Sequence, residues 1–290
     1  MISQEHELSV AEPASLQEES GIPRVFALTN QKGGVGKTTT AVNLGACLAQ
    51  KGSRVLLIDL DPQGNTSTGV GIDRSQVKAG TYEVLSGTAI ADAVVDTQVE
   101  GLSVLPSTID LAGAEVELVS AFARETKLKQ GLQPVRDRYD FVLIDSPPSL
   151  GLLTVNALAA CDRVLVPIQC EYYALEGLGQ LMRTLELIRD GLNPSLSVGG
   201  VVLTMFDART KLAEQVVAEV RSYFGDSVFR TVIPRSVRLS EAPGFGQPII
   251  RYDPSSRAAF AYRELAGEVL ARWGKQTAVD PMTSDEGADR

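Results

Sequence analysis

The sequence predicts an α/β domain built on a single doubly wound, mostly parallel sheet with helices on both faces. Short runs rich in Val, Ile and Leu alternate with longer amphipathic segments along most of the chain, which is the pattern of strand–helix–strand units. The strand-like runs are apolar at nearly every position, as expected of strands that are buried on both faces. The chain has 290 residues, 44% of them hydrophobic and 22% charged, and this composition is typical of a globular protein.

The alternation assigns an order of elements along the chain. The predicted strands are Arg24–Thr29, Arg54–Asp59, Leu102–Leu105, Phe141–Asp145, Arg163–Pro167, Val198–Thr204 and Phe229–Ile233. The predicted helices are Thr38–Lys51, Leu111–Arg138, Thr154–Ala160, Leu175–Asp190, Thr210–Phe224 and Ser256–Arg272. The sequence shows no internal repeat and no linker between these elements, so they are expected to form one domain.

The acidic residues are concentrated at the two ends of the chain. Residues 1–21 hold five glutamates and no Lys or Arg, and residues 275–290 hold four acidic residues against two basic ones. We expect a disordered acidic leader over 1–21, one folded domain over 22–274 and a disordered tail over 275–290. The net charge of −9 therefore does not exclude a nucleic-acid partner, and residues 205–263 hold nine Lys or Arg against six Asp or Glu.

The composition excludes several kinds of chemistry. The single histidine, His6, lies in the leader, which removes Ser-His-Asp and Cys-His catalysis and any site built on histidine ligands. Cys47, Cys161 and Cys170 form no Cys-x-x-Cys pair, and we expect reduced, buried thiols in a cytosolic protein. No apolar run reaches the length of a membrane span, and the acidic N-terminus lacks the pattern of a signal peptide.

The strongest motif is a glycine-rich loop between the first predicted strand and the first predicted helix. It consists of Lys32, Gly33, Gly34, Val35, Gly36, Lys37, Thr38 and Thr39. Glycines let the backbone wrap around an anion, and the backbone amides and the helix N-terminus supply positive potential. We expect Lys37 to neutralise β- and γ-phosphates and the Thr38 hydroxyl to bind Mg²⁺. The loop therefore predicts a P-loop domain that binds ATP with Mg²⁺.

Two further motifs place carboxylates at strand ends, where ligands bind in open α/β sheets. Asp59 and Asp61 end the second predicted strand, and Asp145 ends the fourth. Asp61 can orient or deprotonate a water in line with the γ-phosphate. Asp145 is expected to hold Mg²⁺ through a water, because this ion loses its water shell reluctantly. Asp59 is expected to support the site near the metal or Lys37, and the Ser-Pro-Pro segment after Asp145 is typical of a switch loop.

The loop lacks the early glycine of the common G-x-x-x-x-G-K-[ST] motif and has Lys32 near that point instead. With the segments K-G-G-V-G-K-T-T and D-x-D-P-Q, the sequence resembles the deviant Walker A family of ATPases. This family includes the partition ATPases ParA and Soj, the division-site ATPase MinD and the nitrogenase iron protein. The resemblance implies that Lys32 reaches across a sandwich dimer to the partner's nucleotide and that Asp61 is the hydrolytic residue.

Later segments are similar to the chromosomal ParA/Soj branch, so that the resemblance covers about residues 22–273. These segments are Leu203–Thr210, Ile233–Pro243 and Gly246–Pro254, with departures at Ser236 and at Gly244-Phe245. The resemblance implies that Asp207, Pro234 and Arg235 lie near the adenine. It also implies that Arg209, Arg238 and Arg251 belong to a nonspecific DNA-binding face of the dimer, which is expected to bind phosphates in a salt-dependent way.

The resemblance thus implies a slow, Mg²⁺-dependent ATPase that is cytoplasmic and associated with the nucleoid. An ATP-bridged homodimer would bind DNA nonspecifically, and a ParB/Spo0J-type centromere-binding protein would stimulate hydrolysis during chromosome or plasmid segregation. No membrane partner is expected. Two alternatives stay open: a membrane-recruited positioning ATPase like MinD, which the polar segment 275–290 disfavours, and an iron–sulfur carrier, which the cysteine pattern disfavours.

Overall fold

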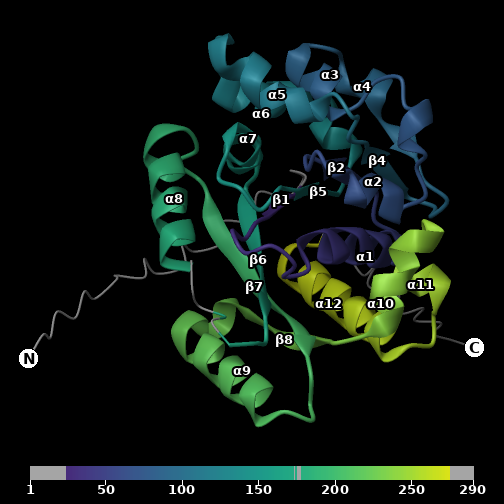
Figure 1. Ribbon diagram of the computed structural model, residues 1–290, viewed down its shortest axis with the longest axis vertical. Helices are drawn as coiled ribbons and strands as arrows, with labels where there is room; N and C mark the ends of the chain where they lie inside the picture. The colour runs from purple at the N-terminus through teal and green to yellow at the C-terminus, as the bar shows by residue number, and fades with distance from the viewer. Residues whose placement is uncertain (1–23, 173, 175–177, 275–290) are drawn as a thin grey trace, which may run out of the picture.

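The computed structural model describes residues 24–274 apart from residue 173 and residues 175–177, so the expected leader and tail lie outside the described residues. The described chain folds around one eight-stranded sheet with the strand order β3-β4-β2-β5-β1-β6-β7-β8 (Figure 1). The strands are β1 (Arg24–Leu28), β2 (Val55–Asp59), β3 (Val95–Asp96), β4 (Leu102–Leu105), β5 (Phe141–Asp145), β6 (Arg163–Gln169), β7 (Ser197–Phe206) and β8 (Val228–Pro234). Only the pairing of β3 with β4 is antiparallel among these strands, which confirms the predicted fold class.

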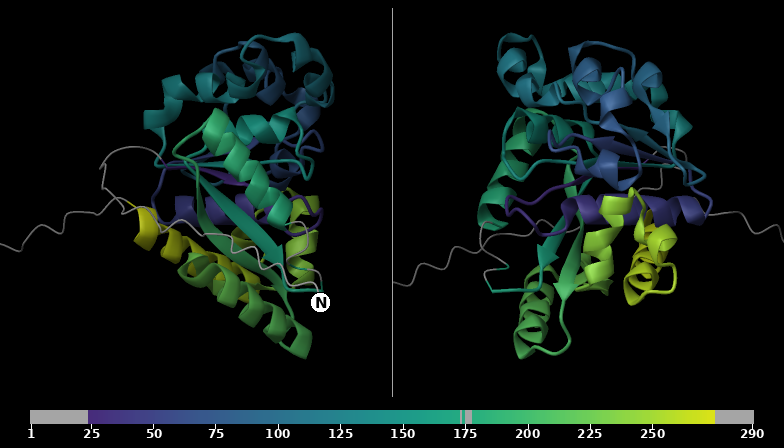
Figure 2. Two further views of the ribbon diagram at one scale, coloured as in Figure 1. Left: turned by 90° about the vertical axis from the view of Figure 1, so that its left-hand side faces the viewer. Right: turned by 45° about the vertical axis from the view of Figure 1, so that its right-hand side comes forward.

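Helices cover both faces of the sheet (Figure 2). They are α1 (Lys37–Gln50), α2 (Asn65–Gly69), α3 (Thr81–Ser86), α4 (Ile90–Ala93), α5 (Leu111–Glu117), α6 (Lys127–Leu132), α7 (Leu152–Ala160), α8 (Leu178–Gly191), α9 (Lys211–Phe224), α10 (Val237–Glu241), α11 (Ile249–Tyr252) and α12 (Arg257–Trp273). Helices α1, α11 and α12 pack on one face, and α3 to α9 supply the other. Within the described part of the chain, no helix is long and apolar enough to cross a membrane.

The two layers follow from the alternation of side chains along each strand. In β1, Val25 and Ala27 belong to the core under α7 and α8, whereas Phe26 and Leu28 belong to the core under α1 and α12. All four side chains are fully buried, and burying each large one contributes about 1.5–3 kcal/mol. A strand that is apolar at every position therefore has a helix layer on each side, as the sequence predicts.

The register brings the carboxyl ends of the central strands to one edge. Asp59 at the end of β2 lies opposite Asp145 at the end of β5, and Leu28 at the end of β1 lies on the other side of Asp145. The strand order reverses at β1, which pairs with both β5 and β6. The loop after β1 therefore opens at the topological switch point, where open α/β sheets bind ligands.

The prediction of one helix over Leu111–Arg138 is wrong. The chain forms α5, several short 3₁₀ turns and α6, with Ala123 in a left-handed conformation at φ 52°. The side chain of Asn156, from α7, accepts a hydrogen bond from Leu128 N (3.1 Å) and donates one to Arg124 O (2.8 Å). It thereby satisfies backbone groups that an unbroken helix would use. This partner comes from 28 or more residues away, so local periodicity could not reveal the break.

Replacing Asn156 with alanine tests this account. The Asn156→Ala variant leaves buried backbone groups at Leu128 and Arg124 without partners, so we expect the free energy of unfolding to fall by about 2–3 kcal/mol. Gln130→Ala is the control, because its side chain makes one exposed bond to Thr126 and should change stability by less than about 0.5 kcal/mol. Urea unfolding measures both, and equal effects would contradict the role of Asn156.

Candidate functional site

The glycine-rich loop is held by residues of three neighbouring strands and the turns after them. Thr204 of β7 is buried, and its hydroxyl donates to Val35 O (2.8 Å) and lies 3.2 Å from Ile168 O of β6. Asn30 donates to Pro167 O (2.8 Å) and accepts from Lys32 N (3.0 Å). These contacts hold the start and the middle of the loop, at Lys32 and Val35, so the backbone amides are oriented by the sheet as well as by the loop sequence.

The two lysines of the loop have different surroundings. Lys37 is buried, and its ammonium donates to Asn30 O (3.0 Å) and to Lys32 O (3.4 Å) inside the loop. Burial lowers the pKa of Lys37, and the charges of Asp145 and Asp61 oppose this shift. Lys32 is half-buried and forms no ion pair with any residue that the structure describes. The structure thus places Lys37 within its own loop, and among the described residues it gives Lys32 no ion-pair partner.

Asp145 lies at the centre of the site and is fully buried. Its Oδ2 accepts hydrogen bonds from the hydroxyls of Thr38 (2.8 Å) and Thr66 (2.7 Å). Its Oδ1 is buried and has no hydrogen-bond partner among the described residues. A buried carboxylate oxygen without a partner is costly, so Oδ1 marks a point where the protein is prepared to accept a further group.

Asp59 is also fully buried, beside Asp145 on the neighbouring strand. Its Oδ2 accepts from the backbone N (2.7 Å) and the hydroxyl (2.5 Å) of Ser67. Burial and then the charge of Asp145 raise the pKa of Asp59 to about 7, and burial raises the pKa of Asp145 to about 6 against the hydrogen bonds from Thr66 and Thr38. Both shifts follow first from burial, which disfavours the charged carboxylates, and neighbouring carboxylates add to them.

This electrostatic arrangement fits a divalent cation. Among the described residues, Asp145 Oδ1 has no hydrogen-bond partner and Lys37 is the one buried Lys or Arg side chain, while a hydroxyl of the loop lies 2.8 Å from the same carboxylate. Oxygen donors of this kind are the ligands that Mg²⁺ prefers. Thr38, Asp145 and, behind them, Asp59 are thus the residues that could hold the ion, as the sequence predicts.

Asp61 lies two residues beyond the end of β2, with 9% of its surface exposed. Its Oδ1 accepts from Gln63 N (3.0 Å), which turns the chain after β2. Arg74 holds this turn by donating to the carbonyl oxygens of Pro62 (2.9 Å) and Gln63 (2.7 Å). The same guanidinium donates to the carbonyls of Ser107 and Thr108 after β4. Arg74 therefore ties the Asp61 turn to the neighbouring strand end.

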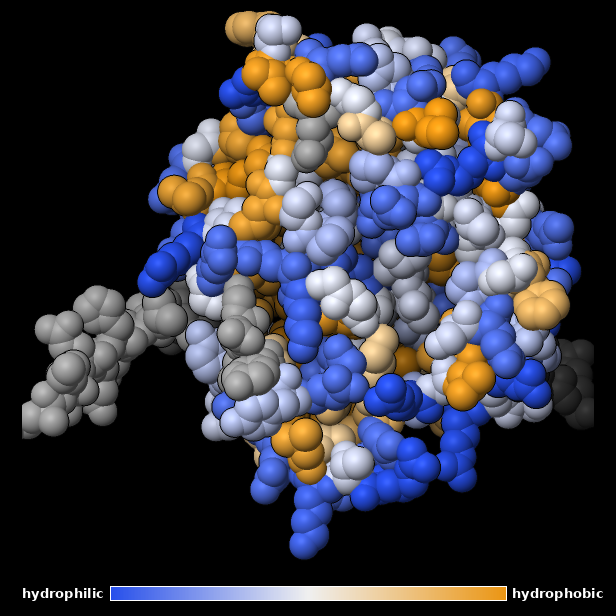
Figure 3. Space-filling view, in the orientation of Figure 1, coloured by the Kyte–Doolittle hydropathy of each residue, from blue (hydrophilic) through white to orange (hydrophobic). Residues whose placement is uncertain are grey.

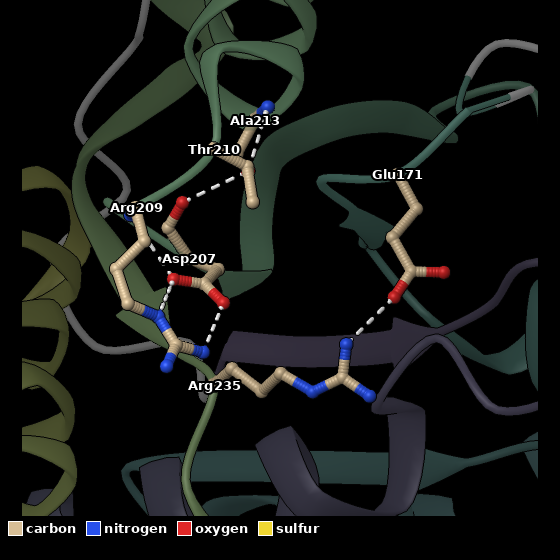
Figure 4. Close-up of polar contacts among 6 residues, drawn as sticks. All are labelled: Glu171, Asp207, Arg209, Thr210, Ala213 and Arg235. Atoms are coloured by element: carbon tan, nitrogen blue, oxygen red, sulfur yellow. Dashed lines mark hydrogen bonds and ion pairs between the residues drawn. The ribbon is translucent and has the colours of Figure 1, made fainter.

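The expected adenine contacts lie together at the ends of β7 and β8. Arg235 N donates to Phe206 O (2.9 Å), so Asp207 and Arg235 are neighbours, and Arg235 forms an ion pair with Glu171 (3.1 Å) (Figure 4). Met205 has a left-handed backbone at φ 53° beside a register shift between β7 and β8. Such strain is concentrated at functional sites.

The three expected DNA contacts fall into two groups. Arg209 follows β7 and is bound in two places to Asp207 (2.8 and 2.6 Å), which holds the pKa of Asp207 well below its usual range (Figure 4). Arg238 on α10 pairs with Glu241 (3.0 Å) and lies 3.6 Å from Asp253. Arg251 on α11, a helix that contacts α10, donates to Gln98 O. The structure therefore brings Arg238 and Arg251 onto adjoining helices and places Arg209 beside the expected adenine contacts.

Apolar side chains are exposed beside the switch segment. Figure 3 shows them gathered at the upper left of the molecule, where Figure 1 places α5, α6 and α8. The exposed large apolar side chains of these elements and the turns between them are Val116, Val119, Phe122 and Leu187. Helix α7, which starts just after the Ser-Pro-Pro segment, contacts both α6 and α8. Large apolar patches on a protein surface are candidate sites for contact with another protein.

The cysteines take no part in the site. All three are buried, and burial raises the pKa of Cys47 to about 12, that of Cys170 to about 11 and that of Cys161 further. Thiols in such surroundings are inert. Among the residues that the structure describes, no cluster of His, Cys, Asp or Glu side chains could hold a metal by itself. The burial of the three cysteines agrees with the expectation that they are small apolar side chains of the core.

The sequence did not reveal the residues that hold the site in place. These residues are Asn30, Thr66, Ser67, Arg74 and Thr204. Each is a common polar residue, and its partner lies on another element. Thr66 and Ser67 had a signal, because they follow the D-x-D-P-Q motif within four residues, and Thr204 lies in the segment Leu203–Thr210 that is similar to the ParA/Soj branch.

Comparisons with known proteins agree on one group. A family profile described as an AAA domain matches residues 23–198. The chain is 58% identical over 249 residues to the sporulation initiation inhibitor protein Soj of Bacillus subtilis (strain 168), which covers 86% of this chain and 98% of that protein. It is 56% identical over 252 residues to the chromosome partitioning protein ParA of Caulobacter vibrioides (strain NA1000 / CB15N), with 86% and 94% covered.

Solved structures with bound nucleotide share the fold. One is a Mycobacterium smegmatis protein named cobyrinic acid a,c-diamide synthase with bound ATP analog and magnesium, at 40% identity and a TM-score of 0.77, covering 87% of this chain and 96% of that one. Another is the septum site-determining protein MinD of Pyrococcus horikoshii OT3 with Mg-ADP, at 26% identity and a TM-score of 0.69, covering 86% and 96%.

Removing the Arg74 clamp should loosen the Asp61 turn. The Arg74→Ala variant loses donors to carbonyls of four residues, so we expect the free energy of unfolding to fall by about 2–4 kcal/mol. We also expect faster hydrogen exchange at residues 61–64. Arg257→Ala, at an exposed position of α12, serves as control and should shift stability by less than about 0.5 kcal/mol. Unchanged exchange at residues 61–64 would show that the turn holds without Arg74.

Proposed function

The chain belongs to the Soj/ParA family of chromosome-partitioning ATPases, and we propose that it works as a nucleotide-dependent switch on DNA. In this proposal ATP and Mg²⁺ bind at the glycine-rich loop, two subunits close over the nucleotides, and the dimer binds DNA nonspecifically. Hydrolysis then releases it. The observation that carries the proposal is the buried Asp145, which accepts from the hydroxyl of the half-buried Thr38 and whose Oδ1 has no hydrogen-bond partner among the described residues, beside the buried Lys37.

Nucleotide binding is assigned to the loop and to the ends of β7 and β8. The amides of residues 32–39 and the Lys37 ammonium would bind the phosphates, and Asp207, Pro234 and Arg235 would flank the adenine. Thr38 and Asp145 would hold Mg²⁺, with Asp145 acting through a water, and Asp59 would support them. The ion would neutralise phosphate charge and fix the phosphate chain. Because Lys37 already points into its own loop (3.0 Å to Asn30 O), its ammonium is preorganised for an anion.

Hydrolysis is assigned to Asp61. This carboxylate lies two residues beyond the end of β2, and its Oδ1 accepts a hydrogen bond from Gln63 N (3.0 Å). Its position beyond the strand end suits a residue that orients an attacking water or accepts its proton. The Arg74 clamp on Pro62 and Gln63 keeps the turn that carries Asp61 in place, and a preorganised side chain favours catalysis.

Dimer formation is assigned to Lys32 and the apolar surface near α7. Lys32 forms no ion pair with the residues that the structure describes, so its charge is available to a nucleotide held by a second copy of the chain. The exposed Val119 and Phe122 lie on the turns between α5 and α6 and give that copy apolar area to cover. A ParB-type centromere-binding protein is the proposed partner that stimulates hydrolysis.

DNA binding is assigned to Arg209, Arg238 and Arg251. Arg209 and Arg238 are more than half exposed and are paired with carboxylates of the same chain. Exposed pairs of this kind contribute little to stability, so phosphate groups can replace the carboxylates at small cost. A dimer doubles the number of such contacts, which supports the steep salt dependence expected of DNA binding. The proposed location is therefore the cytoplasm, on the nucleoid.

The test is DNA binding by the purified protein with ATP, with ADP and without nucleotide, at two salt concentrations. We expect tight, salt-sensitive binding with ATP alone. Lys32→Ala should keep ATP binding but lose the ATP-dependent dimer and DNA binding, whereas Arg238→Glu should keep the dimer and lose only DNA binding. Light scattering after size exclusion measures the dimer. Sedimentation with lipid vesicles in place of DNA binding would favour the membrane-recruited alternative.

Asp61→Ala should separate binding from hydrolysis. We expect ATP affinity and dimer formation within about threefold of the wild type and hydrolysis lowered by at least about 100-fold, because the side chain acts on the transition state. Asp61→Asn is the matched control for geometry, since its oxygen can still accept from Gln63 N. It should lose hydrolysis equally in a phosphate-release assay. Wild-type turnover by either variant would move the role elsewhere, with Asp59 as the next candidate.

A further inference from the structure

Two of the proposed DNA contacts lie on one short segment that rests on the nucleotide loop's own helix. We define the basic segment as residues 237–252, which comprise α10, a 3₁₀ turn over Ala242–Phe245 and α11. It carries Arg238 and Arg251 and packs beside α1 and α2 (Figures 1 and 2). The segment is therefore joined to the two helices that directly follow the glycine-rich loop and the Asp61 turn.

The first connection is the side chain of Asn43. Asn43 lies on α1, is 5% exposed, and donates to Thr39 O (2.7 Å) at the end of the glycine-rich loop. Its Oδ1 accepts from Ile249 N (2.6 Å), the first residue of α11. One buried amide thus links the phosphate-binding turn to the helix that carries Arg251. No role was predicted for Asn43 from the sequence.

The second connection is a close contact between two glycines. Gly71 follows α2 and Gly246 ends the 3₁₀ turn of the basic segment, both with positive φ. A Cβ atom at Gly246 would lie 2.8 Å from Gly71 Cα, so only glycine allows this backbone contact. Helix α2 also carries Thr66, which donates to Asp145. The contact therefore joins the carboxylates of the site to the basic segment.

We propose that Asn43 and the Gly71–Gly246 contact transmit the nucleotide state within one subunit to the basic segment, and so set its affinity for DNA phosphates. This inference rests on the proposed function and adds to it, because dimer formation alone would need no such connection. Asn43 is a positioning residue here: it touches neither nucleotide nor DNA. The state of the loop and of Asp145 is transmitted through rigid contacts, because backbone packed on backbone and a buried amide with two short bonds cannot yield independently.

The contacts of Arg238 and Arg251 with neighbouring groups are what a change of nucleotide state could alter. Arg238 lies between Glu241 (3.0 Å) and Asp253 (3.6 Å), and Tyr252 Oη donates to the same Glu241 carboxylate (3.0 Å). Arg251 donates to Gln98 O, outside the segment. A small movement of α11 relative to α1 would alter together the contacts made by residues of α11 and its C-cap, which join Arg238 to Asp253, Tyr252 to Glu241 and Arg251 to Gln98. A ligand shifts such an equilibrium only by its difference in affinity for the two arrangements, so the ratio of DNA affinities with ATP and ADP is the quantity to measure.

The experiment compares four proteins: wild type, Asn43→Leu, Gly246→Ala and Gly244→Ala. Gly244 lies two residues from Gly246 in the same turn, and a Cβ there meets no atom within 4 Å, so Gly244→Ala is the matched control. Fluorescence anisotropy with a nonspecific DNA duplex gives the affinity with ATP and with ADP. We expect Asn43→Leu and Gly246→Ala to reduce the ratio of the two affinities by at least about fivefold, within the usual range of coupling, and Gly244→Ala to keep it.

ATP affinity and the ATP-dependent dimer, measured by calorimetry and light scattering, should stay within about threefold of the wild type in all variants. Wild-type ratios in both Asn43→Leu and Gly246→Ala would overturn the inference, as would a loss of affinity that is equal with ATP and ADP. Thermal unfolding identifies a variant that fails to fold. If either Asn43→Leu or Gly246→Ala does so, the affinity ratio of the other variant tests the inference.

A readout without DNA separates this inference from the proposed function. Hydrogen exchange at residues 246–252 should respond to ATP in the wild type and in Gly244→Ala but not in Asn43→Leu. If wild-type protein shows this response and yet no ATP-dependent DNA binding, the connection stands and the proposed function is wrong. If it binds DNA with ATP but residues 246–252 do not respond, the connection is wrong and the proposed function stands.

Discussion

Two buried carboxylates on neighbouring strands are the constraint on which the rest of the structure depends. The register of β2 and β5 places Asp59 opposite Asp145, and both are fully buried. Two like charges in a low dielectric are costly unless they are compensated. Lys37 supplies one positive charge, and hydroxyl and amide donors from Thr38, Thr66 and Ser67 supply the nearest further compensation.

This compensation explains why so many elements converge on one sheet edge. Thr38 comes from the start of α1, and Thr66 and Ser67 come from α2. The hydroxyl of Ser67 also accepts from Ser107 N (3.0 Å) after β4. Each donor ties another loop to the carboxylates, so the site organises the connections after four strands. The remaining excess of negative charge and the oxygen without a partner are what a nucleotide–Mg²⁺ complex would satisfy.

The basic segment, residues 237–252, follows a different rule. Its Arg238 is exposed and paired with Glu241 and Asp253, and such pairs are weak and screened by salt. Its Arg251 is exposed and donates to Gln98 O. A surface built this way can exchange partners without affecting the core. Its attachment to α1 and α2 through Asn43 and Gly246 places an exchangeable surface on a rigid base, which is what a reversible switch requires.

The sequence by itself determined the fold class, seven of the eight strands of the described sheet and the position of the glycine-rich loop, whereas the short edge strand β3 was not predicted. Runs that are apolar at every position can only be buried on both faces, and strand ends then bring Asp59, Asp61 and Asp145 to one edge. Local patterns did not determine the break in the predicted Leu111–Arg138 helix, because its reason is Asn156 on another element. The same holds for Thr204, Arg74 and Asn43, because each bonds to a residue of another segment: Thr204 to Val35, Arg74 to Ser107 and Thr108, and Asn43 to Ile249. Hydrogen bonds between distant segments depend on packing, and only the tertiary structure decides which donor meets which acceptor.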